Sequence, residues 1–497
     1  MVRIWFEKGC GDLGPPAGFP RLRIHKYGAV RGAPAFGPSW PRAARGWPCF
    51  FESGSAGTQI RPTLASAFSA AGGEARVQTL TASSVASATA FHHLLNWADA
   101  ATNIQWAVNA ATAGDTVLVS NGTYYLTNQI NISAAITCAS VNGKSVTIVD
   151  GNYPNYTNRC FEITAPATLS GFTVRNGYFF GTNGSIYGGG IYAHSSSLST
   201  MVQDCRISDN TLSNSTTDLA YENYGGGISA VNAVVSNCEI VGNTLAASVI
   251  RGCGAYFGGN STGVACMFTS NILIRGSDGD DSGQAVCLNS LSAGLNSSRI
   301  LYHVSGIKTG ISTVFIRRGT MRNTLVCNNK SLRGGVQTIY GAVIQNCTIV
   351  SNYGSTAGLP SGISIGCIYP YTTSLENVVC YLNTPGSGGE SNFYASVGTT
   401  YTGYCSIVNS CIAPTSSFPT NVAGDYYSVN IESNPQFVNK DSNDFHLAQS
   451  SPCVNAGTNE DWMALDLDGH SRIDHFSRQV DMGCYEYLPQ GMIISVP

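Results

Sequence analysis

The chain has 497 residues, of which 11% are charged and 43% are hydrophobic, and it contains 56 glycines. The low charge content is unlike a coiled coil or helix bundle, and the hydrophobic content is too high for a disordered chain. Residues 1–78 carry a net charge of +6 and residues 79–497 a net charge of −9. The acidic bulk of the chain argues against a nucleic-acid partner, and no apolar run is long enough for a transmembrane segment.

The first 78 residues differ in composition from the rest of the chain. They hold three of the six Trp and many Pro, Gly and Arg, and they show neither strand nor helix periodicity. The stretch LASAFSAA at 64–71 resembles the apolar part of a secretory signal, although it lies far from Met1. We expect residues 1–78 to be a poorly ordered leader or an extension from a misplaced start.

A short amphipathic helix is predicted over residues 103–111, which read NIQWAVNAA. Ile104, Ala107, Val108 and Ala111 recur at the spacing of one helical face. The turn and strand of GDTVLVSNGTYYL follow at once. We expect this helix to cover the exposed edge of the first rung of a repeat.

The middle of the chain repeats a phrase that ends in Asn. The phrase VSNCEIVGN at 235–243 returns as IQNCTIVSN at 344–352. With Asn as the reference position, the copies are spaced irregularly by 24–34 residues, as in a solenoid with loops of varying length. The copies end at Asn176, Asn210, Asn243, Asn271, His303, Asn328, Asn352, Asn383 and Asn409.

The repeated phrase has the period of a strand. Cys238 and Ile240 are two residues apart, so both are expected to face the core while Glu239 faces water. We expect the Asn to turn the corner with left-handed backbone angles, and the Asn amides of successive rungs to hydrogen-bond along the axis. A ligand-binding role for the Asn is the weaker alternative.

A second, glycine-led strand recurs between the Asn positions, as in GGGIYA at 188–193, GGGISA at 225–230 and GCGAYF at 252–257. Two or three short strands per rung, with no helix between them, predict an all-β, right-handed parallel β-helix. We place the solenoid at 79–410 and a C-terminal cap or anchor segment at 411–497. We expect it to be a monomer.

The 17 cysteines include no Cys-x-x-Cys pair, and the histidines lack the spacing of a zinc site. Buried thiols are the preferred interpretation. Isolated disulfides, such as one between Cys405 and Cys411, stay open as an alternative.

Residues 95–490 together resemble the secreted right-handed β-helix proteins of the pectin-lyase-like superfamily. The glycine-led and Asn-ended elements are also similar to polymorphic outer-membrane protein repeats, and residues 451–487 resemble a choice-of-anchor segment of bacterial surface proteins. The resemblance implies an extracellular, cell-surface or outer-membrane setting in a bacterium. It does not imply one activity, because the superfamily mixes lyases, hydrolases and adhesins.

The catalytic residues of the family cannot be carried over to this chain. The Trp-x-Asp-His and Arg-x-Pro-x-x-Arg elements of pectin and pectate lyases are absent, and only the pair Asp280–Asp281 matches polygalacturonase-like hydrolases.

One candidate cluster follows from the repeat itself. Asp278, Asp280 and Asp281 follow the corner at Asn271, and Lys308 and Arg333 lie five residues past the next two corners. Equal offsets on successive rungs predict that these carboxylates and cations share one side. They could bind calcium and a uronate, with a cation as base for β-elimination. A solvated loop with surface ion pairs is the alternative.

Two further groups are candidate binding residues. Tyr340, Tyr369 and Tyr371 could stack on sugar rings, although tyrosines also pack in cores and rims. Asp466 and Asp468 could begin a calcium loop, but the remaining ligands of an EF-hand are absent, and Asx-turns explain the same residues.

We therefore expect a secreted or cell-surface β-helix protein that binds or displays without catalysis, as an adhesin or glycan-binding protein. The alternative is a polysaccharide lyase or glycoside hydrolase acting on a uronic-acid polymer along the side of the helix. The expected partner is a polysaccharide or a cell-surface glycan. An autotransporter passenger is rejected, because the chain shows no C-terminal run of alternating strand segments.

Overall fold

The computed structural model describes residues 77–80, 100–196, 199–275, 282–305, 311–355, 360–368, 370–386, 391–397, 404–418, 426–462, 464–473 and 478–488. The chain divides into two units, residues 1–62 and 63–497, and every described residue belongs to the second. The predicted leader thus falls almost wholly outside the described residues. Among those residues, no helix has the length and apolar character needed to cross a membrane.

The helix α2 (Ile104–Ala110) begins the described solenoid and has the predicted buried face. The Asn103 side chain caps it by accepting hydrogen bonds from the backbone N–H groups of Gln105 and Trp106. Ile104, Ala107 and Val108 are buried in the main core. The helix contacts β1 (Val77–Leu80), β2 (Thr116–Val119) and β4 (Ile130–Ile132) at the start of the ladders, as expected for a cap.

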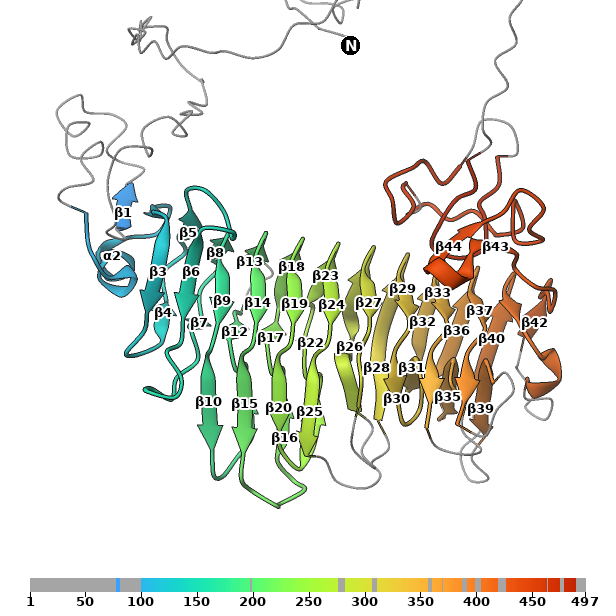
Figure 1. Cartoon of the computed structure of the whole chain (residues 1–497), viewed down its shortest axis with the longest axis horizontal. Coiled ribbons are helices and arrows are strands. Elements are labelled where there is room, and N and C mark those ends of the chain that lie inside the picture. Colours follow the sequence, from blue (N-terminus) through green and yellow to red (C-terminus); the bar gives the residue numbers. More distant parts are fainter. Residues whose placement is uncertain are drawn as a thin grey trace, which may run out of the picture. The chain divides into compact units, whose positions relative to one another are not determined.

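Three parallel strand ladders run along the solenoid, one rung after another (Figure 1). The first consists of β4 (Ile130–Ile132), β7 (Phe161–Ile163), β12 (Ile191–His194), β17 (Ile228–Val231), β22 (Ala255–Gly258), β26 (Ser282–Asn296), β28 (Ile311–Arg322), β31 (Val336–Ile339), β35 (Ile363–Cys367) and β39 (Phe393–Val397). The second consists of β2 (Thr116–Val119), β5 (Thr137–Ser140), β8 (Thr168–Ser170), β13 (Thr200–Gln203), β18 (Ala233–Ser236), β23 (Thr262–Val264), β26, β28, β32 (Ala342–Gln345), β36 (Thr372–Glu376), β40 (Tyr404–Val408) and β42 (Tyr426–Ser428). Because β26 and β28 run through both ladders, the two form one sheet, to which β1 adds antiparallel to β2.

The third ladder is a separate 11-stranded sheet. It consists of β3 (Gly122–Tyr125), β6 (Thr147–Asp150), β9 (Thr173–Arg175), β14 (Arg206–Ser208), β19 (Glu239–Val241), β24 (Met267–Thr269), β27 (Arg299–Leu301), β29 (Leu325–Cys327), β33 (Thr348–Val350), β37 (Val379–Tyr381) and β41 (Cys411–Ile412). The prediction of an all-β parallel solenoid with a short capping helix is confirmed. The ladders continue past residue 410, through β41 and β42.

Short side sheets extend some of the rungs. They are β10 (Tyr178–Gly181), β15 (Thr211–Asn214), β20 (Thr244–Ala246) and β25 (Ile272–Arg275); β11 (Ile186–Tyr187), β16 (Glu222–Tyr224) and β21 (Val249–Arg251); and β30 (Lys330–Ser331), β34 (Tyr353–Gly354) and β38 (Thr384–Pro385).

The strand phrase alternates as predicted. Cys238 and Ile240 are buried in the core, while Glu239 is partly exposed and forms an ion pair with Arg206 on the preceding rung, 2.7 Å away. The pairing of Ile207 with Ile240 keeps the apolar side chains in one inward column.

The predicted Asn ladder is present. Asn243 Nδ2 donates to Asn271 Oδ1 (3.0 Å) and to the Ile207 carbonyl oxygen (2.8 Å), and the Asn243 backbone N–H also donates to Asn271 Oδ1. The oxygen and nitrogen of the Asn243 side-chain amide are buried and hydrogen-bonded to protein groups, so they do not need water as a partner. It consists of Asn210, Asn243, Asn271, His303, Asn329, Asn352, Asn383 and Asn392.

The prediction that the Asn turns the corner with left-handed backbone angles is confirmed at Asn176, Asn328 and Asn409, but it is wrong at the Asn residues of the ladder, such as Asn210, Asn243 and Asn271. The left-handed residue is the one before the ladder Asn, as at Asp209 (φ 57°), Gly242 (φ 65°) and Ser270 (φ 53°). The assignments of Asn176 and Asn328 are therefore one residue early, since both have positive φ, and the ladder residue after Asn328 is Asn329. Asn409 lies at a different corner, after β40, in register with Asn377.

The glycines of the glycine-led strands lie directly against the amides of the Asn ladder. A Cβ atom on Gly227 would lie 2.7 Å from Asn243 Cγ, and one on Gly254 would lie 2.8 Å from Asn271 Nδ2. Glycine in the strand therefore leaves the space that the ladder amide occupies. This contact explains why both elements recur in the same rung.

The C-terminal part of the chain folds back along the outward side of the third ladder (Figure 1). It contains η4 (Thr415–Ser417), η5 (Lys440–Ser442) and the antiparallel pair β43 (Phe437–Asn439) and β44 (Asp444–Leu447). Phe445 and Leu467 pack on Leu325 and Val350, and Arg299 Nη2 donates to Asp468 Oδ1 (2.5 Å). At the last rungs, Phe418 packs against Phe393 and Tyr427 and joins the main core.

The fourteen cysteines whose side chains the structure describes are buried free thiols, as preferred from the sequence. The suggested Cys405–Cys411 disulfide is wrong. Cys405 faces the solenoid core, whereas Cys411 faces outward beneath the C-terminal segment.

Candidate functional site

The predicted Asp–Arg cluster falls mostly outside the described residues. Four of its members lie there: Asp278, Asp280, Asp281 and Lys308. Arg333 lies half-buried in the turn between β30 and β31. Because the ladder residue of its rung is Asn329, Arg333 follows the ladder residue by four positions, whereas Lys308 follows the ladder residue His303 by five. The equal offset on which the cluster was predicted is therefore not present.

Two of the three predicted tyrosines meet. Tyr340 and Tyr371 lie edge to face, with ring centroids 5.9 Å apart, and Tyr369 is outside the described residues. Arg318 on β28 lies over both rings and donates to the Tyr371 hydroxyl (2.9 Å). The prediction thus placed two residues at one end of a larger surface.

That surface, here the aromatic belt, crosses successive rungs on the outward side of the first ladder and its side strands. Its members are linked in sequence by ring contacts, ion pairs and cation–π contacts. They are Arg159, Glu162, Tyr187, Tyr192, His194, Glu222, Tyr224, Arg251, Tyr256, Arg317, Arg318, Tyr340 and Tyr371.

A column of stacked rings forms the middle of the belt. Tyr187 stacks on Tyr192 (4.9 Å between centroids) and on Tyr224 (4.7 Å), and Tyr192 also stacks on His194 (4.0 Å). Tyr224 contacts Tyr256 (4.6 Å), which is almost fully buried. Since ring faces cover one another, the column presents ring edges and hydroxyl groups outward.

Glu162 on β7 joins an arginine and a histidine at one end of the column. It pairs with Arg159 (3.2 Å) and with His194 Nε2 (3.1 Å), and it accepts from Gln129 Nε2 (2.6 Å). Partial burial opposes its charge, but the hydrogen bond from His194 and the charge of Arg159 outweigh burial and lower the pKa of Glu162. The carboxylate is thus held ionised.

Glu222 on β16 makes a second such cluster. It pairs with Arg251 (2.7 Å), accepts from the Tyr224 hydroxyl (2.7 Å) and lies 3.8 Å from Arg317. Despite burial, the bonds from Tyr224 and Arg251 lower the pKa of Glu222. Arg317 also lies over the Tyr340 ring, so it joins this cluster to the end of the belt at Arg318 and Tyr371.

The phenols of the belt are donors and not bases. Burial raises the pKa of Tyr192 and of Tyr256 to about 12. Burial and the bond to Glu222 raise the pKa of Tyr224 further. The four arginines of the belt outnumber its two glutamates, in a part of the chain with a net charge of −9. The belt therefore offers fixed donors and a cationic surplus.

Sequence reasoning missed most of the belt, although one signal was available. Tyr192 and Tyr256 occupy the same outward position of the glycine-led strands, since both are in register with Ser229. Tyr187, Glu222 and Arg251 lie in side strands of varying length, which no repeat alignment brings together.

The calcium candidates are engaged by protein donors. Asp466 Oδ1 accepts from the backbone N–H groups of Asp468 (3.0 Å) and His470 (2.7 Å), as in an Asx-turn. Asp468 binds Arg299 through one oxygen and His446 Nε2 through the other (2.8 Å). Within the described residues, no three or more His, Cys, Asp or Glu side chains are grouped to hold a metal ion.

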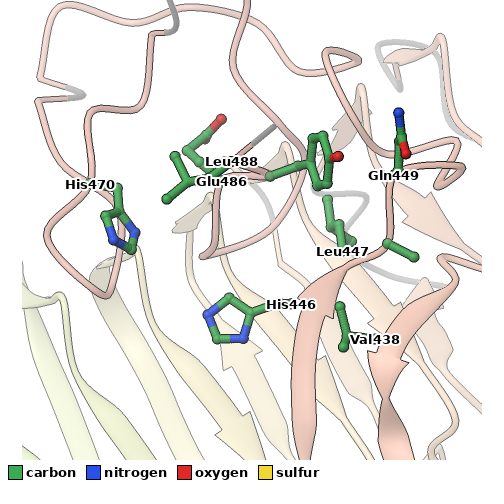
Figure 2. Close-up of a pocket in the computed structure, with 9 residues that line it drawn as sticks. Val438, His446, Leu447, Gln449, His470, Glu486 and Leu488 are labelled. Carbon is green, nitrogen blue, oxygen red and sulfur yellow. The ribbon is translucent and has the colours of Figure 1, made fainter. Parts of the chain in front are cut away.

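The C-terminal segment has a pocket of its own, of about 430 Å³. Figure 2 shows His446, on β44, and His470, on a neighbouring loop, among its lining residues with Leu447, Gln449 and Glu486. His446 Nδ1 pairs with Asp444 (2.6 Å) and its ring packs on Tyr485 (4.1 Å). Both His446 nitrogens are thus already bonded to carboxylates, which makes this imidazole part of the fold.

Comparison with known proteins found solved structures of similar fold. The structure is similar to pectate lyase Pel9A, with a TM-score of 0.42 and 17% identity over 79% of this chain and 93% of that one. It is also similar to a PL6 alginate lyase in complex with a trisaccharide, with a TM-score of 0.39 and 14% identity over 70% of this chain and 88% of that one. No family model matches the sequence, and no curated protein matches it.

Proposed function

We propose that this protein binds a linear, acidic polysaccharide along the aromatic belt. The observation that carries the proposal is the chain of tyrosines and arginines, joined through Glu222, that runs from Arg159 to Tyr371. From β7 to β31 the ladder advances by six pairings, which is roughly 29 Å at about 4.8 Å per rung. A surface of this length suits several units of a polymer better than a single small ligand.

The chemistry of the belt favours an acidic polymer. Guanidinium groups match carboxylates and sulfates with paired hydrogen bonds. Arg317 keeps part of its donors available for a ligand, since it lies 3.8 Å from Glu222 and its side chain is 37% exposed. Tyrosine hydroxyls and the ionised Glu162 and Glu222 supply donors and acceptors for sugar hydroxyls.

Binding without cleavage is the reading that these groups support best. The two carboxylates are neutralised by arginines, and the phenols have raised pKa values, so both lack the character of a free general base.

Binding can be tested by titration with polyuronates and with neutral dextran at several salt concentrations. We expect salt-sensitive binding to the polyuronate alone, weakened about tenfold or more by the double substitution R317A/R318A. Arg206→Ala is the matched control, because Arg206 is a similarly exposed, ion-paired arginine on the third ladder. Equal loss in the control, or equal binding of dextran, would contradict the proposal.

Cleavage of the same polymer by β-elimination is the second candidate. The feature that favours it is His194, since imidazoles exchange protons near neutral pH and His194 is hydrogen-bonded to Glu162 at the edge of the belt. A lyase would release an unsaturated product with ultraviolet absorbance, and His194→Ala would abolish this product. If the wild-type chain gives no such product, this candidate is rejected.

A secreted or cell-surface location in a bacterium is part of the proposal, with the choice-of-anchor-like residues 451–487 as the attachment segment. Fractionation of expressing cells tests the location. Recovery of the protein only in the cytosol would contradict it.

A further inference from the structure

Two cysteines meet where the C-terminal segment lies on the last strand of the third ladder. Cys411 is on β41, and Cys453 follows β44 in the segment that folds back over the ladder. Both side chains are fully buried, in a cluster with Val379, Leu447 and Met482. The two thiols are neighbours within this cluster, and the Cys411 thiol donates to the Ser433 carbonyl oxygen (3.3 Å).

The position of this pair differs from that of Cys205 and Cys238. Cys205 and Cys238 are also neighbours, but they directly precede the adjacent parallel strands β14 and β19, whose register begins at Arg206 and Glu239. Ladder spacing holds such side chains about 4.8 Å apart, beyond the roughly 3.5–4.5 Å between Cβ atoms in a disulfide. Cys453 comes from a segment outside the ladders, so no such spacing separates it from Cys411.

We propose that Cys411 and Cys453 form a disulfide that staples the C-terminal segment to the solenoid when the chain folds under oxidising conditions. The oxidant is a small-molecule disulfide of the glutathione class. Each thiol loses its proton, one sulfur–sulfur bond forms, and the two electrons reduce the small disulfide to two thiols. The structure shows the dithiol form.

Burial of the two thiols determines the stage of folding at which the disulfide forms. The contact with Cys453 and burial raise the pKa of the Cys411 thiol, so the folded dithiol is a poor nucleophile. Exchange therefore takes place while the segment docks, before Val379, Leu447 and Met482 cover the pair. Once formed, the bond closes the chain from 411 to 453 and opposes undocking.

The test is oxidative refolding of the full chain. The reduced chain is unfolded in denaturant, refolded with a mixture of reduced and oxidised glutathione, and mapped by mass spectrometry without reductant. We expect a cross-linked peptide that joins Cys411 to Cys453, and a thermal transition of the C-terminal segment several degrees higher than in the dithiol form.

Cys453→Ser and Cys411→Ser are expected to lose the cross-link, whereas the matched variant Cys238→Ser keeps it. Since a variant could fail to fold, the peptide map of the refolded wild-type chain decides by itself. If both thiols are still open to alkylation after unfolding, or if the cross-link joins other cysteines, the proposal is overturned.

Discussion

Asn271 Nδ2 and His303 Nε2 lie 3.1 Å apart inside the buried corner of the solenoid, and His303 Nδ1 lies 3.1 Å from Asn329 Oδ1. The ladder therefore passes through an imidazole. A neutral ring with its proton on Nδ1 donates to Asn329 and accepts from Asn271, as the Asn amide does at the other rungs. A second proton on Nε2 would face the Asn271 amide donor.

The first prediction concerns acid stability. Burial lowers the pKa of His303 from 6.5 to about 4, so between these values the unfolded chain binds a proton that the folded chain does not. Stability should therefore fall as pH falls through this window, by about 2 kcal/mol between pH 7.5 and pH 5. His303→Asn restores the amide ladder, and we expect it to remove this part of the acid sensitivity.

Thermal unfolding at both pH values measures the effect. His194→Asn serves as the control, because His194 is about one-third exposed, outside the ladder. The interpretation fails if the two variants lose stability with acid to the same extent as the wild type.

The second prediction concerns the contact between glycine and the ladder amide. A Cβ on Gly227 would approach both Asn243 Cγ and the Gly254 carbonyl oxygen to 2.7 Å, and neither the ladder amide nor the backbone can move freely. We expect Gly227→Ala to destabilise the solenoid by about 1–3 kcal/mol. Urea unfolding, followed by circular dichroism, measures the change in midpoint.

Gly294→Ala is the matched control for this substitution. Gly294 is also in a strand, but the nearest atom to its added Cβ would be Thr262 Cγ2 at 3.5 Å, an ordinary contact. We expect this variant to unfold close to the wild-type midpoint. A similar loss in both variants would show that strand glycine itself, and not the ladder contact, sets the cost.

The repeat predicted the fold because inward positions carry the same constraint in every rung. Cys238 and Ile240 recur where each rung must fill the same space, so a comparison of rungs reveals them. The sequence alignment is wrong by one residue at the corner, because Asn occurs there in two different roles. Asn328 adopts left-handed angles, whereas Asn329 supplies the ladder amide. Only the strand pairing separates the two roles.

The candidate site was harder to predict for a related reason. Glu222, Arg251 and Arg317 come from two side strands and from β28, and they meet only after loops of unequal length have folded. Tyr340 and Tyr371 were predicted from their aromatic character, and the structure adds the arginine between them. Outward residues are constrained by a ligand or by a neighbouring side chain and not by the repeat, so a comparison of rungs does not reveal them.

The last prediction concerns the hold of the C-terminal segment on the solenoid. His446 on β44 lies between Asp444 and Asp468, and its imidazole ring packs on Tyr485. Asp468 in turn binds Arg299 of β27. Partial burial opposes the charge on this imidazole, but the bonds to Asp444 and Asp468 outweigh it and raise the pKa of His446 above 6.5. The stabilisation is therefore complete below pH 6.5 and is lost as pH rises through the raised value.

Hydrogen exchange of β43, β44 and the loop at 464–473 measures this hold. We expect a few-fold faster opening at about pH 8.5 than at about pH 6, after correction for intrinsic exchange, and a smaller change at high salt because His446 is 39% exposed. His446→Gln should open this region at both pH values and abolish the difference, whereas His194→Gln should leave it unchanged. A pH dependence that persists in His446→Gln would assign the hold to another group.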